Sequence, residues 1–192
     1  MFIYTDLLRA ALCCTASQED TRKILRGIHI TPTHIRATNG IAAVSMSHGS
    51  KTEIEGVFIL HGDIPASAEG TVFQKVGSQW IAAHSDDYER LVGHNELELV
   101  EGKFPDPGKL LPTEEEPCSE FPIFAAELLA LPYRMFGKEF TSMPVNFKLF
   151  GPEKPCQVLF NVAVNTFYGD PVLVIMPMKS TVFELHRKAM EG

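Results

Sequence analysis

The sequence predicts an α+β protein in which antiparallel strands dominate and two short helices carry apolar stripes. Short runs of alternating or β-branched apolar residues recur along the chain, and turn signals such as Asn39-Gly40 and Gly77-Ser78 separate them. Before the C-terminal tail, helical spacing of apolar residues occurs in two segments, residues 7–12 and 125–136. The 192 residues, of which 45% are hydrophobic, are sufficient for one large domain or two small ones.

The first 48 residues predict a β-α-β-β-β unit. Residues 2–4 are extended, and Thr5 or Asp6 is expected to cap a helix. From residue 24 to residue 48 the pattern indicates strands, with turns at residues 31–34 and at Asn39-Gly40. The helix buries a stripe made of Leu7, Leu8, Ala11 and Leu12.

The middle of the chain is expected to contain only strands. A strand over residues 56–60 is followed by residues 65–70, which are too few and too poor in large apolar side chains for a helix. Residues 71–76 and 79–84 predict a hairpin that turns at Gly77-Ser78, and residues 97–100 alternate as a further strand.

An acidic, proline-ended connector at residues 113–117 is the best candidate boundary. Beyond it we expect a helix over residues 125–136 with Leu128, Leu129 and Leu131 inward, kinked or shortened by Pro132. Strands at residues 145–150, 157–164 and 172–176 follow, in an order that repeats residues 2–48. Thr181 and Glu184 have the spacing of a capping box, which predicts a helical tail.

Composition excludes several classes of protein. The net charge of −7 argues against a chain that coats DNA, although a ring with an acidic outer face and a few inward cations stays possible. Cys13, Cys14, Cys118 and Cys156 have no C-x-x-C spacing, and the seven histidines are scattered, so we expect no metal site and no cofactor. Catalytic motifs are absent, which ranks an enzyme last. Neither a leader nor a long apolar run is visible, so a cytoplasmic location without membrane contact is expected.

Four short motifs occur in an order that resembles the bacterial sliding clamp, the β subunit of DNA polymerase III. That family has a DTR-type entry to a strand, an A-T-D-G turn, a G-R-F-P-D segment and a late V-M-P-M-R segment. The counterparts here are Asp20-Thr21-Arg22, Ala37-Thr38-Asn39-Gly40, Gly102-Lys103-Phe104-Pro105-Asp106 and Val174-Ile175-Met176-Pro177-Met178-Lys179. The resemblance implies a DNA-clamp-like fold built from β-α-β-β-β units.

The resemblance also implies a division of the chain, which has about half the length of a bacterial clamp. Residues 1–112 match the middle domain without its second helix, residues 113–118 are a linker, residues 119–180 match half of a domain, and residues 181–192 form an additional helical tail.

In the family, a groove between the middle and last domains captures short peptides of polymerases, the clamp loader and repair proteins. Its matched lining is Leu25 on the strand after the DTR entry, Thr38, Gly40, Pro105, Lys109, Leu110, Val174, Met176, Pro177 and Met178. Ile41 and Ala42 replace the family's histidine and arginine, and Ala43 replaces a bulky aliphatic residue, so the groove is widened and loses polar contacts.

The resulting interpretation is a sliding-clamp-like processivity factor of DNA replication that binds peptides and, as a homo-oligomer, non-specific double-stranded DNA. The alternative is a monomeric phage or mobile-element adaptor or decoy that competes for clamp-binding partners without encircling DNA. The structural alternative for Met176 and Met178 is that they only end a core strand and bind nothing. Weak DNA contacts are predicted for Arg9, Arg22, Lys23, Arg26, Arg134 and Lys138.

Overall fold

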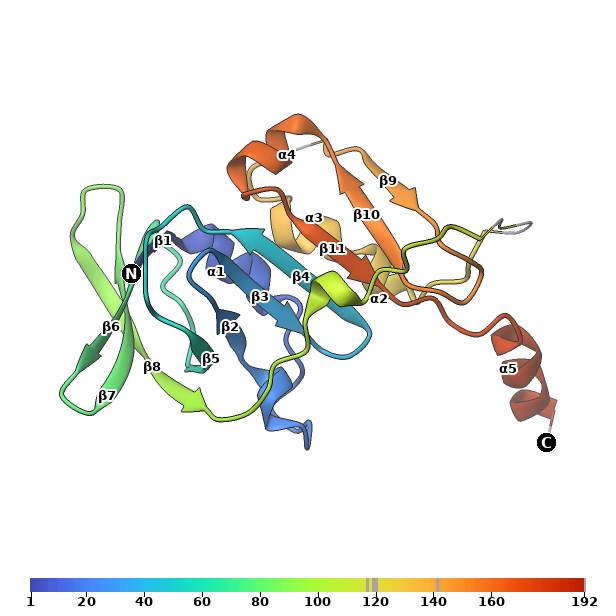
Figure 1. Cartoon of the computed structure of the whole chain (residues 1–192), viewed down its shortest axis with the longest axis horizontal. Coiled ribbons are helices and arrows are strands. Elements are labelled where there is room, and N and C mark those ends of the chain that lie inside the picture. The colour runs from blue at the N-terminus through green and yellow to red at the C-terminus, as the bar shows by residue number, and fades with distance from the viewer. Residues whose placement is uncertain (117, 119–120, 141, 192) are drawn as a thin grey trace.

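A computed structural model describes residues 1–116, 118, 121–140 and 142–191. Its strands form one antiparallel, eleven-stranded sheet in the order β1-β6-β7-β8-β5-β2-β3-β4-β11-β10-β9, and helices cover one face (Figure 1). The strands are β1 (Phe2–Tyr4), β2 (Ile28–Ile30), β3 (His34–Thr38), β4 (Ala42–Ser47), β5 (Gly56–His61), β6 (Gly70–Val76), β7 (Gln79–Ser85), β8 (Leu91–Val100), β9 (Val145–Lys148), β10 (Cys156–Phe160) and β11 (Val172–Ile175).

The predicted first helix is present as α1 (Thr5–Leu12), and Leu7, Leu8 and Ala11 are buried as expected. The predicted cap is wrong. Thr5 is already inside the helix, and Tyr4 occupies the N-cap position without a side-chain hydrogen bond. The Thr5 hydroxyl is instead 2.8 Å from the Thr71 hydroxyl on β6, so tertiary contact replaces capping.

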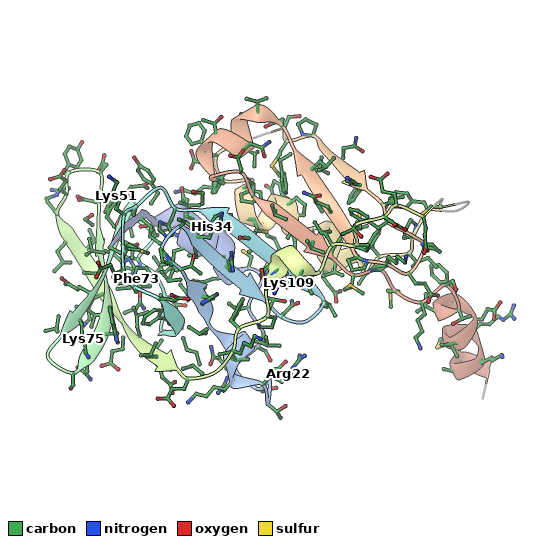
Figure 2. The ribbon with its side chains drawn as sticks, viewed as in Figure 1. Arg22, His34, Lys51, Phe73, Lys75 and Lys109 are labelled. Carbon is green, nitrogen blue, oxygen red and sulfur yellow. The ribbon has the colours of Figure 1, made fainter. Side chains whose placement is uncertain are left out.

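The strands of the middle region form a twisted ribbon at one end of the sheet (Figure 1). The hairpin of β6 and β7 turns at Gly77-Ser78 as predicted, and Gly77 has φ +61°. Strand β8 is longer than residues 97–100 because it pairs with β7 on one side and with β5 on the other. Phe73 is fully buried, whereas the labelled Lys75 points away from the ribbon (Figure 2).

The predicted helix at residues 125–136 is divided into α2 (Ala126–Leu129) and α3 (Leu131–Phe136). Pro132 lies in the first turn of α3, which is the shortening that the sequence predicts. The break corrects one expectation: Leu128 and Leu131 are buried, but Leu129 is 46% exposed.

Helix α3 packs beside α1 on the same face of the sheet (Figure 1). The Cys14 sulfur, just after α1, is 3.9 Å from the Met135 sulfur on α3. On the other side of α3, Phe136 is fully buried, with its ring centroid 5.0 Å from that of Phe160 and 4.5 Å from that of Tyr168. Residues from both sides of the acidic connector therefore contribute to one hydrophobic core.

Strand β4 pairs with β11 from Ser45 opposite Val172 to Ala42 opposite Ile175, and this pairing continues the sheet across the connector. The predicted strand at residues 157–164 ends early, at Phe160. Asn161 accepts a hydrogen bond from the Val164 amide at 3.0 Å and so begins α4 (Val162–Phe167).

Two further elements complete the chain. Residues 23–26 form a 3-10 helix, η1 (Lys23–Arg26), so Leu25 does not lie on the strand where it was expected.

The predicted C-terminal helix is present as α5 (Val182–Glu191) and projects from the body of the protein (Figure 1). Within the described residues, no helix is both long and apolar enough to cross a bilayer.

Candidate peptide-binding groove

The turn between β3 and β4 is held by its own side chains. Asn39 Oδ1 accepts hydrogen bonds from the amides of Ile41 and Ala42 at 3.0 and 2.8 Å. The Thr38 hydroxyl donates to the Ala42 carbonyl at 2.7 Å, and Gly40 has φ +95°, which favours glycine. These contacts fix the turn and leave Ile41 48% exposed at its tip.

The end of β11 lies directly beside this turn. Val174 is paired with Ala43, and the Met176 amide donates to the Ile41 carbonyl at 2.8 Å. The chain thereby brings Met176 next to Ile41, although the two residues are 135 positions apart in the sequence.

A second turn, at residues 106–110, also contributes to the surface around Met176. Asp106 caps the 3-10 helix η2 (Pro107–Lys109) by accepting from the Gly108 amide at 3.1 Å, and the Leu110 amide donates to the Pro107 carbonyl. Leu110 is 40% exposed. It closes a small cavity of about 50 Å³ together with Thr38, Gly40, Val174 and Met176, and Ile41, Ala42 and Ala43 complete the lining.

A larger cavity of about 430 Å³ adjoins the small one and shares Ile41 and Met176 with it. Its other apolar residues come from three places: Leu128 of α2 with the preceding Ala125, Pro177 and Met178 after β11, and Val182 and Leu185 of α5. Its charged residues are Glu127 and Lys179. We call the two cavities together the groove. It is mainly apolar and is assembled from four separate segments of the chain.

The structure brings together seven of the ten predicted groove residues. Thr38, Gly40, Leu110, Val174 and Met176 line the small cavity, and Met176, Pro177 and Met178 line the large one. Leu25, Pro105 and Lys109 are outside both linings: Leu25 belongs to η1 and is only 4% exposed, and Pro105 and Lys109 lie on the exposed segment around η2 (Lys109 in Figure 2).

The motifs did not reveal Leu128, Val182 or Leu185, which form walls of the large cavity. Their signal in the sequence is only the apolar spacing of residues 125–136 and of the tail. That spacing predicts helices, but it does not tell which surface the helices face.

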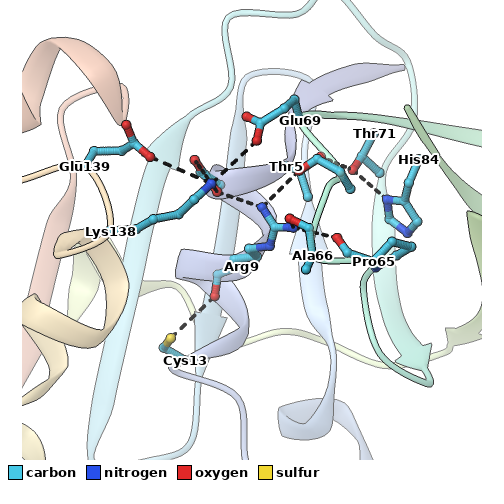
Figure 3. A network of polar contacts seen from close by, with 12 residues as sticks. Thr5, Arg9, Cys13, Pro65, Ala66, Glu69, Thr71, His84, Lys138 and Glu139 are labelled. Atoms are coloured by element: carbon cyan, nitrogen blue, oxygen red, sulfur yellow. Dashed lines mark hydrogen bonds and ion pairs between the residues drawn. The ribbon is translucent and has the colours of Figure 1, made fainter. Parts of the chain in front are cut away.

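The cations predicted to contact DNA are in two places, and most are engaged within the protein. Arg9 on α1 donates to Asp6 at 2.9 Å and to the carbonyls of Pro65, Ala66 and Ala68. Lys138, just after α3, lies 3.4 Å from Asp6, 3.6 Å from Glu69 and 3.7 Å from Glu139 (Figure 3). Arg134 is the one predicted cation without an ion pair or side-chain hydrogen bond among the residues that the structure describes.

The second place is the segment around η1. The Arg22 side chain donates two hydrogen bonds to the Asp20 carboxylate, at 3.0 and 2.8 Å, and the Arg22 amide donates a third at 2.8 Å; these bonds lower the pKa of Asp20 to about 2. Lys23 is paired with Glu98, and Arg26 donates to the Gln18 carbonyl at 2.8 Å. The labelled Arg22 lies at an edge of the molecule (Figure 2). Phosphate contact by these residues would have to replace contacts that already exist.

A buried polar chain links α1 to the ribbon (Figure 3). From Thr5 it runs through the Thr71 hydroxyl to His84 Nδ1 at 2.9 Å, and His84 Nε2 is 2.7 Å from Asn95 Oδ1. Burial lowers the pKa of the His84 imidazole, against a smaller opposite effect of the Asn95 hydrogen bond. No cluster of three or more potential metal ligands occurs in the described part of the chain.

Comparison with solved structures defines the class of fold: it is that of the bacterial sliding clamps. The DNA polymerase sliding clamp of Bacillus subtilis matches with a TM-score of 0.58 and 12% identity over 94% of this chain and 64% of its own. The DNA polymerase III β chain of Streptococcus pneumoniae matches with a TM-score of 0.57 and 13% identity, again over 94% of this chain and 64% of its own.

A putative DNA polymerase III β subunit of Eubacterium rectale gives a TM-score of 0.60 and 10% identity, over 93% of this chain and 65% of its own. The predicted resemblance and α+β clamp-like fold are thus confirmed at the level of structure. The chain spans less than two thirds of the length of each of these three proteins. No protein-family model and no curated protein sequence matches it.

Proposed function

We propose that this protein is a clamp-like, non-enzymatic factor of DNA replication whose groove captures short apolar peptides of polymerases or other replication proteins. One observation carries the proposal: the turn at Thr38–Gly40, the η2 segment and the end of β11 converge on two joined apolar cavities. The same segments carry the motifs that resemble the family.

The chemistry of the lining suits such a ligand. Met176 and Met178 are both partly exposed, and methionine side chains are flexible and polarizable, so they repack around different apolar partners. The exposed Ile41 and Leu110 flank Met176, so a Leu or Phe side chain that enters the groove removes several apolar surfaces from water at once.

A processivity role requires more than the groove. A ring around a duplex needs further copies of the chain, because α1 and α3 supply only two of the helices that would face DNA. We therefore place homo-oligomerisation and sequence-independent DNA contact within the proposal. The proposal also includes the division of the chain into two clamp-like regions, with a linker at residues 113–118 between them and a tail at residues 181–192.

A second candidate is a monomeric adaptor or decoy that occupies the clamp-binding peptides of replication proteins without encircling DNA. It is favoured by the engaged cations: Arg9 and Lys138 share Asp6, and Lys138 also meets Glu69 and Glu139. With a net charge of −7, the chain then offers few free cations to a duplex.

The groove is tested with a fluorescein-labelled peptide of sequence Ser-Leu-Ser-Leu-Phe titrated against the full chain. Met176→Asp places a charge between the two cavities and is expected to weaken binding at least about tenfold, since roughly 1.4 kcal/mol corresponds to a factor of ten. Met190→Asp is the matched control, because Met190 is 90% exposed and lines neither cavity. Equal affinity for all three proteins would eliminate the groove.

Solution mass and retention on DNA separate the two candidates. A closed oligomer that stays on circular DNA and is lost after linearisation supports the processivity factor. A strict monomer that binds the peptide but neither circular nor linear DNA supports the adaptor. Tight binding to one particular DNA sequence would contradict both.

A further inference from the structure

The base of α5 is fixed to the body of the protein at two points. The Met178 amide donates to the Ile123 carbonyl at 2.7 Å, and the Ser180 amide and hydroxyl both donate to Glu153 Oε1, at 2.9 and 2.8 Å. These hydrogen bonds, first that of the Ser180 amide and then that of its hydroxyl, lower the pKa of Glu153. The direction in which α5 leaves β11 is therefore set by specific contacts.

The two sides of α5 are not equivalent. Val182 and Leu185 are three residues apart, so they lie on one side of the helix, and both line the larger cavity. Phe183 and Met190, seven residues apart, share another side and are 69% and 90% exposed. Only the first pair adjoins the groove.

Opposite α5, the larger cavity is bounded by Leu128 of α2, which is 4% exposed, and by Ala125. Met178 lies in the connection between β11 and α5 and also lines the cavity. The volume of about 430 Å³ is in the range of small-ligand sites, whereas about 50 Å³ in the small cavity is not. A large side chain has room only in the larger cavity.

We propose that α5 is a wall of the peptide groove, and that Val182 and Leu185 on one side and Leu128 on the other enclose a large apolar side chain, Leu or Phe, of the bound peptide. This inference rests on the proposed function. It makes Leu185 a specificity-determining residue, because this side chain is 55% exposed before binding and is covered by the ligand. A short side chain at that ligand position leaves Leu185 in water.

Two variants of α5 test the wall with the peptide Ser-Leu-Ser-Leu-Phe. Leu185→Asp is expected to weaken binding about tenfold or more. Phe183→Asp introduces the same charge two residues away, on the side that does not line the cavity, and is expected to leave affinity unchanged. Replacing the ligand Phe by Ala should lower affinity for the wild type and have little further effect on Leu185→Asp.

Failure of the inference is distinguishable from failure of the groove. If Met176→Asp weakens binding but Leu185→Asp and Phe183→Asp both bind like the wild type, α5 is not a wall and the groove stands. If the wild type itself does not bind the peptide, both proposals fall. Amide hydrogen exchange gives a second readout: peptide binding should protect amides of α5 as well as those near Met176, and protection near Met176 alone would overturn the inference.

Discussion

Phe136 offers a test of whether the regions on either side of residues 113–118 unfold as one unit. Its fully buried ring packs edge-to-face on Phe160 and tilted on Tyr168, on the α3 side of the connector. A buried Phe→Ala change costs roughly 3–5 kcal/mol, and for Phe136→Ala, whose ring makes two aromatic contacts, we expect about 4 kcal/mol, the middle of that range. For a chain of this size that corresponds to a fall in Tm of roughly 8–16 °C.

The single tryptophan makes the test selective. Trp80 is on β7 of the ribbon and packs against Phe58 with ring centroids 5.2 Å apart, so its fluorescence reports the first region only. Urea unfolding of Phe136→Ala should shift the Trp80 transition and the circular dichroism transition together. Tyr133→Ala, on the same helix but with Tyr133 70% exposed, should shift neither by much. A Trp80 transition that stays in place would refute the shared core.

Two further predictions concern stability. Because burial holds the pKa of His84 below its usual 6.5, the unfolded chain takes up a proton first, so the free energy of unfolding should fall as the pH drops below about 6.5 and stay level above it. His84→Gln should reduce that slope in urea titrations without abolishing it, because burial also lowers the pKa of His29 and His34; an unchanged slope would contradict the prediction. Gly169→Ala should destabilise by more than about 2 kcal/mol, since φ is +62° and its Cβ would lie 2.0 Å from the Ser47 carbonyl oxygen. Gly49→Ala, at φ +67° in open space, should cost only about 1 kcal/mol, and equal Tm values for the two variants would contradict the contact.

Local chemistry made much of the fold predictable from the sequence. Asn39-Gly40 and Gly77-Ser78 mark hairpins because glycine readily adopts the positive φ found at Gly40 and Gly77. Pro132 divides the second helix because it lacks an amide to continue the hydrogen bonding. Such signals act within a few residues, which is the range of sequence reasoning.

The errors arose where distant contacts decided the outcome. Thr5 looked like a helix cap but bonds to Thr71, which is 66 residues away. Similarly, no local pattern shows that β4 pairs with β11 or that α3 lies beside α1. One error was local: the prediction of a strand over residues 157–164 overlooks Asn161, whose side chain caps α4 by accepting from the Val164 amide three residues on.

The residues of the candidate site fall into the same two groups, those that local motifs predict and those that distant contacts determine. Motifs gave Thr38, Leu110 and Met176, which lie together because the ends of β3, η2 and β11 meet at the small cavity. They gave no information on the partners of the cations. Lys23 meets Glu98 at a separation of 75 residues, and Lys138 meets Asp6 at a separation of 132.

The protein has two proposed binding surfaces, the apolar groove for peptides and the cations for DNA. The ion pairs of the cations also indicate which of these two surfaces binds its ligand first. To reach a phosphate, Arg9 would exchange four existing hydrogen bonds, including a charge-assisted one to Asp6, for new ones of similar strength. The net gain for each such cation is small, and salt reduces it further. Ile41, Met176 and Leu185, in contrast, expose apolar surface whose removal from water is favourable without breaking a contact. We therefore propose that peptide capture by the single chain precedes DNA contact, and that DNA contact becomes favourable only when several copies present cations such as Arg134 to the same duplex.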